Sequence, residues 1–267
     1  LTIGEGAQHI DVFAVDSNAT YGDEPLQMEG VATSDLPVSY TSSNPDVLEV
    51  NGTQLKVRGA GVAVIYANQS GSANYLAAAE RNATVVVHTA ELQVIAEPKS
   101  KAYLEPLPEL TYHYEGFVND ENASVLEEAP SISTTATAES VAGEYPITLN
   151  DGAAANYHFH YLGSELSIGE TTQHIDVFAV DSNATYGDDP LQIEGVATSD
   201  LAVSYSSSNP DVLEVNGTQL KVRGAGVAVI YANQSGDANY EAASERNATV
   251  VVHTKELTVI AEPKSKA

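Results

Sequence analysis

The sequence contains no cysteine and no tryptophan, and it has one methionine and only 11 lysine and arginine residues in 267. Without cysteine there can be no disulfide, no thiolate zinc site and no cysteine nucleophile. Packing or bound ions must therefore stabilise the fold. Long apolar runs are also missing, since no stretch approaches the roughly 18 apolar residues of a membrane-spanning helix. The opening residues, LTIGEGAQHI, lack the basic and then apolar pattern of a signal peptide.

Acidic side chains dominate the charge, because 37 Asp and Glu residues give a formal net charge of −26. Such a surface repels a phosphate backbone, whose binding depends on basic side chains. Anionic lipid is repelled on the same grounds. We therefore expect neither nucleic acid nor a membrane as a partner. The apolar content of 43% is ordinary for a folded protein and too high for disorder.

A near-identical internal repeat covers most of the sequence. The run QHIDVFAVDSNATYGD starts at Gln8 and again at Gln173, and residues 1–102 align with 166–267 with 12 differences in 102 positions. Arrays this uniform usually serve length or multivalency, because a catalytic site does not ordinarily need near-identical copies. The repeat therefore favours a structural or multivalent role.

A second, fainter period of 82 residues lies inside the first. Tyr21 recurs as Tyr103, and the tripeptide Ala73-Asn74-Tyr75 recurs at 155–157. Since 165 is close to twice 82, we interpret the chain as a tandem of two related module types. The expected divisions are the end of a second-type module at 1–7, a first-type module at 8–90, a second-type module at 91–172, a first-type near copy at 173–255 and the start of another second-type module at 256–267.

The first-type module has the pattern of short strands throughout. The predicted strands are His9–Val15, Val38–Ser43, Val47–Val50, Gln54–Val57, Val62–Asn68 and Ala83–Thr89. Asn51-Gly52 predicts a tight hairpin turn, because this dipeptide accepts positive φ angles. Short strands separated by turns about every 8 to 12 positions predict a mainly β chain of tandem β-sandwich modules.

The second-type module differs in its middle. ELQVIAE, ELTYHYEGF, EYPITLN and NYHFHYLGSELSI predict strands. In contrast DENASVLEE, residues 120–128, could form one or two helical turns after a capping Asn119 or Asp120. We therefore expect an intervening β module that could hold a short helix.

Both module types resemble repeats of large bacterial surface proteins. Residues 37–78, with their copy at 202–243, resemble bacterial immunoglobulin-like repeats through SYTSSNPDV, GAGVAVIYA and the closing ANY. Residues 103–168 resemble the MBG-type repeats that alternate with such domains in bacterial adhesins. Tyr103-Leu104-Glu105 departs from the usual Tyr-Gly-Asp of that family. The resemblance implies immunoglobulin-like first-type modules and MBG-like second-type modules in a secreted or surface-anchored protein.

Calcium is the one ion that the loops suggest, and no cofactor is required. Acidic and Asn-rich loops offer the hard oxygen ligands that calcium prefers. The spacing in DSNATYGD differs from the D-x-[DN]-x-[DN]-G loop, and a solvated acidic surface that serves solubility is the simpler alternative. The candidate ligands are Asp16, Asn18 and Asp23, their copies Asp181, Asn183 and Asp188, and the group Asn119, Asp120 and Glu121.

Histidines are a second candidate for metal binding. His158 and His160 share one face of a predicted strand, and His113 could lie on a neighbouring strand, where imidazoles could bind zinc or copper. A polar strand face is the simpler interpretation. The sequence shows no nucleophile, base and orienting group together and no G-x-S-x-G elbow, so we do not expect an enzyme.

Four tyrosines of the second-type module could provide a stacking platform for a glycan or a protein. They are Tyr112, Tyr114, Tyr157 and Tyr161. Aromatic residues at period two more often form core or cross-strand pairs.

The sequence thus predicts an extracellular stalk or extender segment of a repetitive bacterial cell-surface adhesin, which projects a distal binding domain. The alternative is that the repeats are themselves weak, multivalent glycan- or protein-binding modules. Expected partners are neighbouring repeats of the same chain, with any host or surface glycan or protein bound through other domains. We expect this segment to be monomeric.

Overall fold

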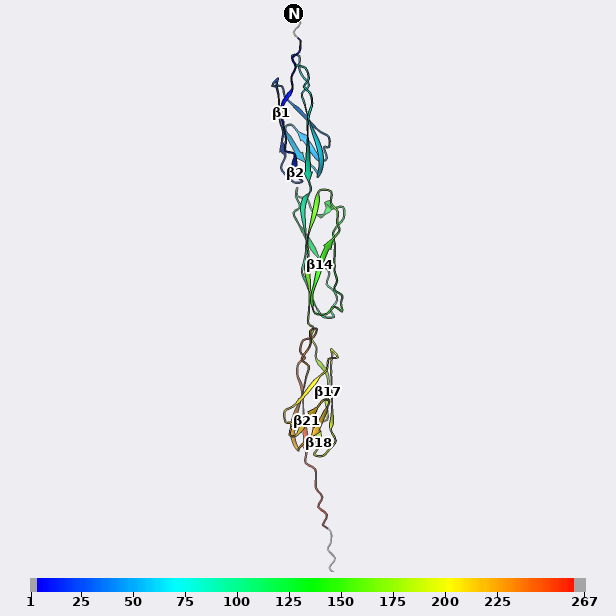
Figure 1. Ribbon diagram of the computed structural model, residues 1–267. Helices are drawn as coiled ribbons and strands as arrows, with labels where there is room; N and C mark the ends of the chain where they lie inside the picture. Colours follow the sequence, from blue (N-terminus) through cyan, green and yellow to red (C-terminus); the bar gives the residue numbers. More distant parts are fainter. Residues whose placement is uncertain (1–3, 262–267) are drawn as a thin grey trace, which may run out of the picture. The chain divides into compact units, whose positions relative to one another are not determined.

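The computed structural model describes residues 4–261, which are almost entirely strand and loop (Figure 1). These residues contain no α-helix, and they contain no helix that could cross a membrane. The mainly β prediction is confirmed. The described residues form two compact units: one runs to Lys99 and adds Glu109–Thr135 and Pro146–Leu166, and the other holds the remainder. We refer to residues 8–90 as the first copy, 91–172 as the middle region and 173–255 as the second copy.

The first copy is built from nine short strands in three small sheets. Their bounds are β1 (Ile10–Ala14), β2 (Asn18–Thr20), β3 (Leu26–Gln27), β4 (Glu29–Ala32), β5 (Ser39–Ser42), β6 (Leu48–Asn51), β7 (Gln54–Val57), β8 (Gly61–Asn68) and β9 (Arg81–His88). The sheets have the orders β1-β4, β2-β9-β8-β5 and β3-β7-β6. The edge strand β2 is parallel to β9, and the other neighbouring strands of these three sheets are antiparallel.

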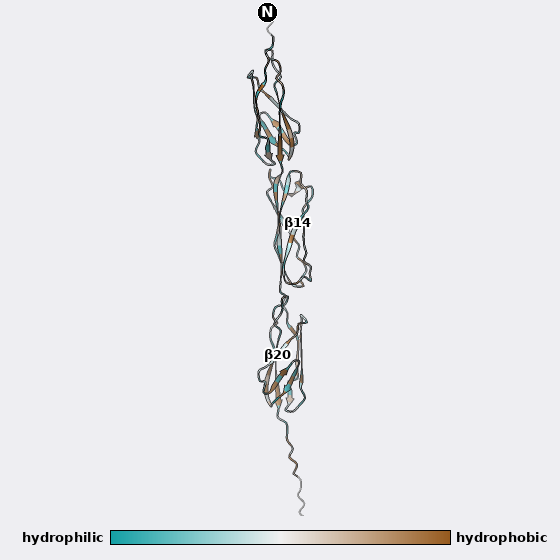
Figure 2. Cartoon of the chain, in the orientation of Figure 1, coloured by the Kyte–Doolittle hydropathy of each residue, from teal (hydrophilic) through white to brown (hydrophobic). Residues whose placement is uncertain are grey.

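Period-two alternation explains why these segments form half-buried strands. Along β8 the side chains of Ala63, Ile65 and Ala67 are buried, while their neighbours are only partly covered. Along β9 the side chains of Val85 and Val87 are buried in the same alternating way. Alternate residues of a strand point to opposite faces, so each strand contributes one apolar row to the core. Figure 2 shows apolar stretches, in brown, along strands of both copies.

The second copy repeats this arrangement in two sheets. Its strands are β17 (Ile175–Val180), β18 (Asn183–Thr185), β19 (Leu191–Ala197), β20 (Ser204–Ser207), β21 (Leu213–Asn216), β22 (Gln219–Val222), β23 (Gly226–Asn233) and β24 (Arg246–His253). The orders are β17-β19-β22-β21 and β18-β24-β23-β20. One unbroken strand, β19, replaces β3 and β4, and Ile193 there takes the place of Met28.

The middle region forms two further sheets. Its strands are β10 (Ala90–Ala96), β11 (Lys99–Ala102), β12 (Tyr112–Glu115), β13 (Ser131–Thr134), β14 (Gly143–Asn150), β15 (Tyr157–Leu162) and β16 (Ser164–Gly169). The orders are β12-β10-β15 and β11-β16-β14-β13. In the first sheet β10 is central, antiparallel to β12 and parallel to β15.

The predicted helix is reduced to a single 3-10 turn, Ala123–Val125, and Asn122 caps it by accepting a hydrogen bond from the Ser124 amide at 3.0 Å. The capping positions predicted from sequence are wrong. Asn119 and Asp120 have φ angles of 56° and 57°, a left-handed geometry that cannot start a right-handed helix.

The six predicted strands of the first copy are all present, within two residues of their expected ends, and Gln54–Val57 has the same ends. The segments β2, β3 and β4 were not predicted, because each has only two to four residues and too little alternation. Of the predicted end module at 1–7, residues 1–3 lie outside the described residues, and Gly6 forms a parallel bridge with Tyr75. Of the predicted start at 256–267, residues 262–267 lie outside, and 256–261 form no strand.

Candidate functional site: two tyrosine junctions

Loops of the middle region contact the two repeat copies at two places. We call these the first junction, between the first copy and the middle region, and the second junction, between the middle region and the second copy. The residues of each junction described below belong to one compact unit. Each junction can therefore be described through its own contacts.

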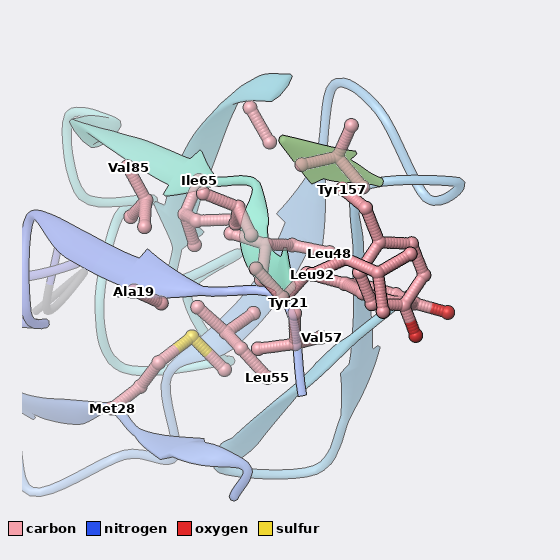
Figure 3. Close-up of a cluster of buried hydrophobic side chains, with 14 residues drawn as sticks. Ala19, Tyr21, Met28, Leu48, Leu55, Val57, Ile65, Val85, Leu92 and Tyr157 are labelled. Atoms are coloured by element: carbon pink, nitrogen blue, oxygen red, sulfur yellow. The ribbon is translucent and has the colours of Figure 1, made fainter. Parts of the chain in front are cut away.

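A carboxylate shared by two tyrosines forms the centre of the first junction. The Tyr21 hydroxyl donates to Glu121 Oε1 at 2.7 Å, and the Tyr157 hydroxyl donates to Glu121 Oε2 at 2.5 Å. The two rings meet edge to face, with centroids 5.7 Å apart. Tyr21 and Tyr157 are only 6% and 4% exposed, and Figure 3 shows their hydroxyl oxygens, in red, at the edge of the core cluster.

Burial raises the pKa of both Tyr21 and Tyr157, and the hydrogen bond to the Glu121 carboxylate raises each pKa further. A phenolate here would be poorly solvated and would face a second negative charge. Both hydroxyls therefore stay protonated and act as hydrogen-bond donors over the neutral pH range.

Asn156 joins the backbones of the two regions. Its Oδ1 accepts from the Ala60 amide at 2.9 Å, and its carbonyl oxygen accepts from the Ala90 amide at 2.9 Å. In the same junction Gly22 has a φ of 98°, and a Cβ added there would lie 2.8 Å from Val118. Glycine therefore adopts the turn without a steric penalty, and the close approach of Val118 leaves no room for a Cβ.

Apolar packing continues through the first junction. The buried cluster that contains Leu48, Leu55 and Ile65 of the first copy also contains Leu92 and Tyr157 of the middle region (Figure 3). Protein cores are packed as densely as organic crystals, so a shared core resists bending more than a solvated linker does. The first copy and the middle region are thus joined by a core and not only by a peptide.

The second junction uses the same residue types. Tyr103 of the middle region meets Tyr240 of the second copy edge to face, with centroids 5.5 Å apart. The Ala142 amide donates to Asn239 Oδ1 at 2.9 Å. At both junctions, therefore, the upstream part supplies a tyrosine and an alanine amide, and the downstream part supplies the asparagine and tyrosine of an Ala-Asn-Tyr loop.

The departure Tyr103-Leu104-Glu105 keeps the turn that Tyr-Gly-Asp makes in the copies. Leu104 has a φ of 66°, and Gly22 at the matching position has 98°. Glu105 Oε2 accepts from the Ala102 amide at 2.9 Å, as Asp23 Oδ2 accepts from the Thr20 amide at 2.7 Å. The turn is preserved at the cost of a left-handed leucine.

Lys101 stabilises the loop that carries Tyr103. Its side chain is buried, and Nζ donates to the carbonyl oxygens of Glu105 and Ala138, each at 2.9 Å. The ammonium group thereby holds the tyrosine loop against the loop that precedes Ala142.

The predicted calcium ligands have other roles in several cases. Asp23 and Asp188 close their turns, and Glu121 binds the two tyrosines. Asn18 and Asn183 face His88 and His253 with their Oδ1 atoms at 3.3 Å, whereas Asp16, Asp181, Asn119 and Asp120 are exposed. In the part of the chain that the structure describes, no group of three or more acidic or histidine side chains could hold a metal ion. Calcium binding stays a prediction.

The three histidines do share one face of the sheet β12-β10-β15. Glu91 lies 3.8 Å from His158 and 3.6 Å from His160, measured between ring nitrogen and carboxylate oxygen. His113 is paired separately, at 3.5 Å from Glu97 and 3.7 Å from Glu115. These side chains are about half exposed, which agrees with a solvated polar strand face.

The four tyrosines of the predicted stacking platform do not form a free surface. Tyr157 is buried in the first junction, and Tyr114 packs against the core cluster. The hydroxyls of Tyr112 and Tyr161 donate to the backbone oxygens of Pro130 and Asp151. Their hydroxyls and rings are thus used within the fold.

Sequence reasoning missed the junction residues as a functional set. The signal was present, because a tyrosine and an Ala-Asn-Tyr tripeptide both recur at the 82-residue period. The tyrosines that recur with this period are the ones that meet edge to face at the two junctions.

Residues 92–167 match the MBG domain family (YGX type). The matched segment begins just after Glu91 and spans most of the middle region, which agrees with the resemblance stated above. No curated protein matches the chain.

Several solved structures overlap with the chain at low similarity. Drosophila N-cadherin EC1-4 has 12% identity and a TM-score of 0.33, over 96% of this chain and 76% of that one. The Bacteroides ovatus mixed-linkage glucan utilization protein SGBP-B, solved with a heptasaccharide, has 12% identity and a TM-score of 0.25, over 94% and 71%. Surface layer protein SbsC, domains 1–6, has 12% identity and a TM-score of 0.24, over 94% and 40%. At these TM-scores the overlaps say nothing about function.

Proposed function

We propose that this chain is an extender segment of an extracellular, bacterial cell-surface repeat protein of the adhesin type, with no enzymatic activity of its own. Its role is to hold consecutive β modules in a defined succession, so that a binding domain elsewhere in the protein is carried away from the cell. The observation that supports this role best is the core shared across the first junction.

A spacer must resist bending at its joints, and the first junction has the features for this. Only Thr89 separates β9 from β10, so there is no flexible linker. Tyr21, Tyr157 and Glu121 are held together by two hydrogen bonds in a buried setting, where such bonds are stronger than in water. Bending at this joint would expose apolar surface and break both bonds.

The acidic composition supports the same role. A net charge of −26 disfavours association between neighbouring copies and keeps a long array in solution. Related modules without such repulsion would tend to associate through their exposed strand edges.

Small-angle X-ray scattering on the 267-residue chain tests the extender role. We expect a maximum dimension close to that of modules joined end to end, and a shorter average dimension for Tyr21→Ala, which weakens the first junction. Measuring the wild type in calcium and in chelator tests the predicted ion, because calcium-dependent stiffness would appear only in the first condition. A compact particle in both conditions would contradict the proposal.

A binding experiment separates the extender from a multivalent binder. An extender shows no saturable binding to glycans or surface proteins, whether one or several repeats are present. A multivalent binder gains avidity with the number of repeats. Copy-dependent retention on a glycan array would therefore replace the extender role with the adhesive one.

A further inference from the structure

One end of the second copy carries an open hollow. It is lined by Tyr186, Gly224, Ala225, Thr254 and Lys255. Tyr186 is 50% exposed there, although it is the counterpart of the buried Tyr21. The hollow is therefore a place where the same sequence lacks the cover that it has in the first copy.

Every residue that lines the hollow has a counterpart in contact with the middle region. Those counterparts, 165 positions earlier, are Tyr21, Gly59, Ala60, Thr89 and Ala90. Tyr21 donates to Glu121, the Ala60 and Ala90 amides donate to Asn156, Thr89 Oγ1 lies 3.0 Å from His158 Nδ1, and a Cβ on Gly59 would lie 3.3 Å from Asn156 Oδ1. The correspondence covers the whole hollow and is not limited to the tyrosine.

The turn beside the hollow already has the conformation of its counterpart in the first junction. Gly187 has a φ of 95° where Gly22 has 98°. Asp188 Oδ2 accepts from the Thr185 amide at 2.7 Å, as Asp23 Oδ2 does from Thr20. A surface already in its bound conformation loses little conformational entropy on docking, which favours affinity.

One substitution distinguishes the hollow from its covered counterpart. Lys255 replaces Ala90, and its Nζ would lie 3.6 Å from a Cβ added at Gly187. A cation beside Tyr186 favours a partner with a carboxylate in the position of Glu121. The change therefore keeps the apolar and backbone features and adds a preference for acidic groups.

From these observations we propose that the hollow around Tyr186 is a docking surface for a β module of the middle-region type. Such a module presents an Ala-Asn-Tyr loop, whose asparagine accepts from the Ala225 amide and whose tyrosine meets Tyr186 edge to face. It also presents a carboxylate that accepts from the Tyr186 hydroxyl. This inference rests on the proposed function and names the partner that this end of the second copy takes.

Tyrosine nitration, located by mass spectrometry, tests the proposal on a lengthened chain. A copy of residues 103–172 is added after Ala267, because 256–267 differ from 91–102 only at Thr258 and so begin the same module. The peptides of Tyr21 and Tyr186 are distinguishable through Glu24 and Asp189. In the 267-residue chain we expect Tyr186 to react about tenfold faster than Tyr21, in line with local differences in protection. In the lengthened chain it should react at the rate of Tyr21.

Two matched variants sharpen the test. Asn156→Ala with Tyr157→Ala in the added copy alone should restore fast nitration of Tyr186, whereas Lys255→Ala should leave its protection in place. In the 267-residue chain, Asn156→Ala should raise the rate of Tyr21 toward that of Tyr186, which tests the correspondence without any added residues.

Unchanged, fast nitration of Tyr186 in a lengthened chain whose added residues resist protease would overturn the docking surface. Equal rates for Tyr21 and Tyr186 in the 267-residue chain would overturn it as well. Scattering from the same samples separates this failure from failure of the proposed function, since the 267-residue chain can be extended whether or not Tyr186 docks a module.

Discussion

The two repeat copies have 90 of 102 aligned residues in common, since 12 differ, yet the same loop behaves differently in each. Tyr21 is 6% exposed and bonded to Glu121, whereas Tyr186 is 50% exposed. The turns that carry the two tyrosines have the same hydrogen bond and nearly the same φ. Local sequence therefore determines the shape of the loop, and the neighbouring module determines whether the tyrosine is buried.

Several differences between the copies lie near their ends or near the Ala-Asn-Tyr loop. Gly6 and Ala7 become Thr171 and Thr172, and Leu76 becomes Glu241, all close to the Ala-Asn-Tyr loop of each copy. Ala90 becomes Lys255 at the opposite end. By contrast, residues 42–71 and 207–236, which form most of the core strands, are identical. In the buried core the copies differ at Met28, which becomes Ile193, and the tyrosines of the contact loops are kept.

The largest effect should come from removing the buried ring. Tyr21→Ala should lower the free energy of unfolding by about 3 kcal/mol, because it leaves a cavity in the shared core and removes the donor to Glu121 Oε1. Tyr186→Ala, the same change at an exposed site, should cost less than about 1 kcal/mol. Denaturant titration and calorimetry measure the free energy of unfolding of both variants. Equal losses would mean that the first junction adds nothing to stability.

Removing the shared carboxylate should have the next largest effect. Glu121→Ala should cost about 2 kcal/mol, because two buried hydroxyls lose a charged acceptor. Glu121→Gln keeps one acceptor oxygen and should cost less. Glu127→Ala, at an exposed glutamate six positions away, is the matched control and should change the free energy of unfolding little. A comparable loss in the control would indicate a general effect of acidic residues.

High pH should loosen the first junction. Burial, followed by the Glu121 hydrogen bond, raises the pKa of Tyr21 and Tyr157 above the ordinary value of about 10. The folded state thus holds these protons more tightly than the unfolded state. Their contribution to stability is complete below about pH 10 and is lost as the pH rises through the raised values. Tyrosinate absorbance should show tyrosines that ionise at a higher pH than the rest, and Tyr21→Phe should remove one of them. Titration of all tyrosines together would contradict this.

The smallest expected change in stability concerns the turn at Leu104 and the matching glycine turns of the copies. Leu104→Gly should raise stability by about 1 kcal/mol, because glycine adopts the left-handed φ of 66° without a steric penalty. The reverse exchange, Gly187→Leu, should lower stability by a similar amount at the exposed turn. Thermal unfolding measures both shifts. If Leu104→Gly destabilises the chain, contacts of the leucine side chain outweigh its backbone strain.

Strands were predictable from the sequence because their cause is local. Gln54–Val57 alternates polar and apolar residues and follows Asn51-Gly52, so both its face and its turn are encoded within a few positions. The junction was not predictable in the same way. Tyr21 and Glu121 are 100 positions apart, and no periodic pattern relates them. Glu121 looked like a calcium ligand because an acidic loop offers the same oxygens to a metal as to a hydroxyl.

The short-range rules also failed where the backbone adopts an unusual conformation. Asn119 and Asp120 are common helix caps, and they were predicted as such. Both instead adopt positive φ, which these two residue types tolerate better than most. Their conformation turns the chain just before Glu121, whose side chain meets the two tyrosines. The residues that misled the helix prediction thus belong to the loop that carries the junction carboxylate.

The one-residue connection at Thr89 has a mechanical consequence. A pull along the chain passes from β9 directly into β10, without a linker to absorb it. Each of these strands has a parallel neighbour, β2 beside β9 and β15 beside β10. Tension that slides parallel strands past one another loads their hydrogen bonds together and not one at a time. The first copy and the middle region should therefore yield abruptly under force, after little lengthening.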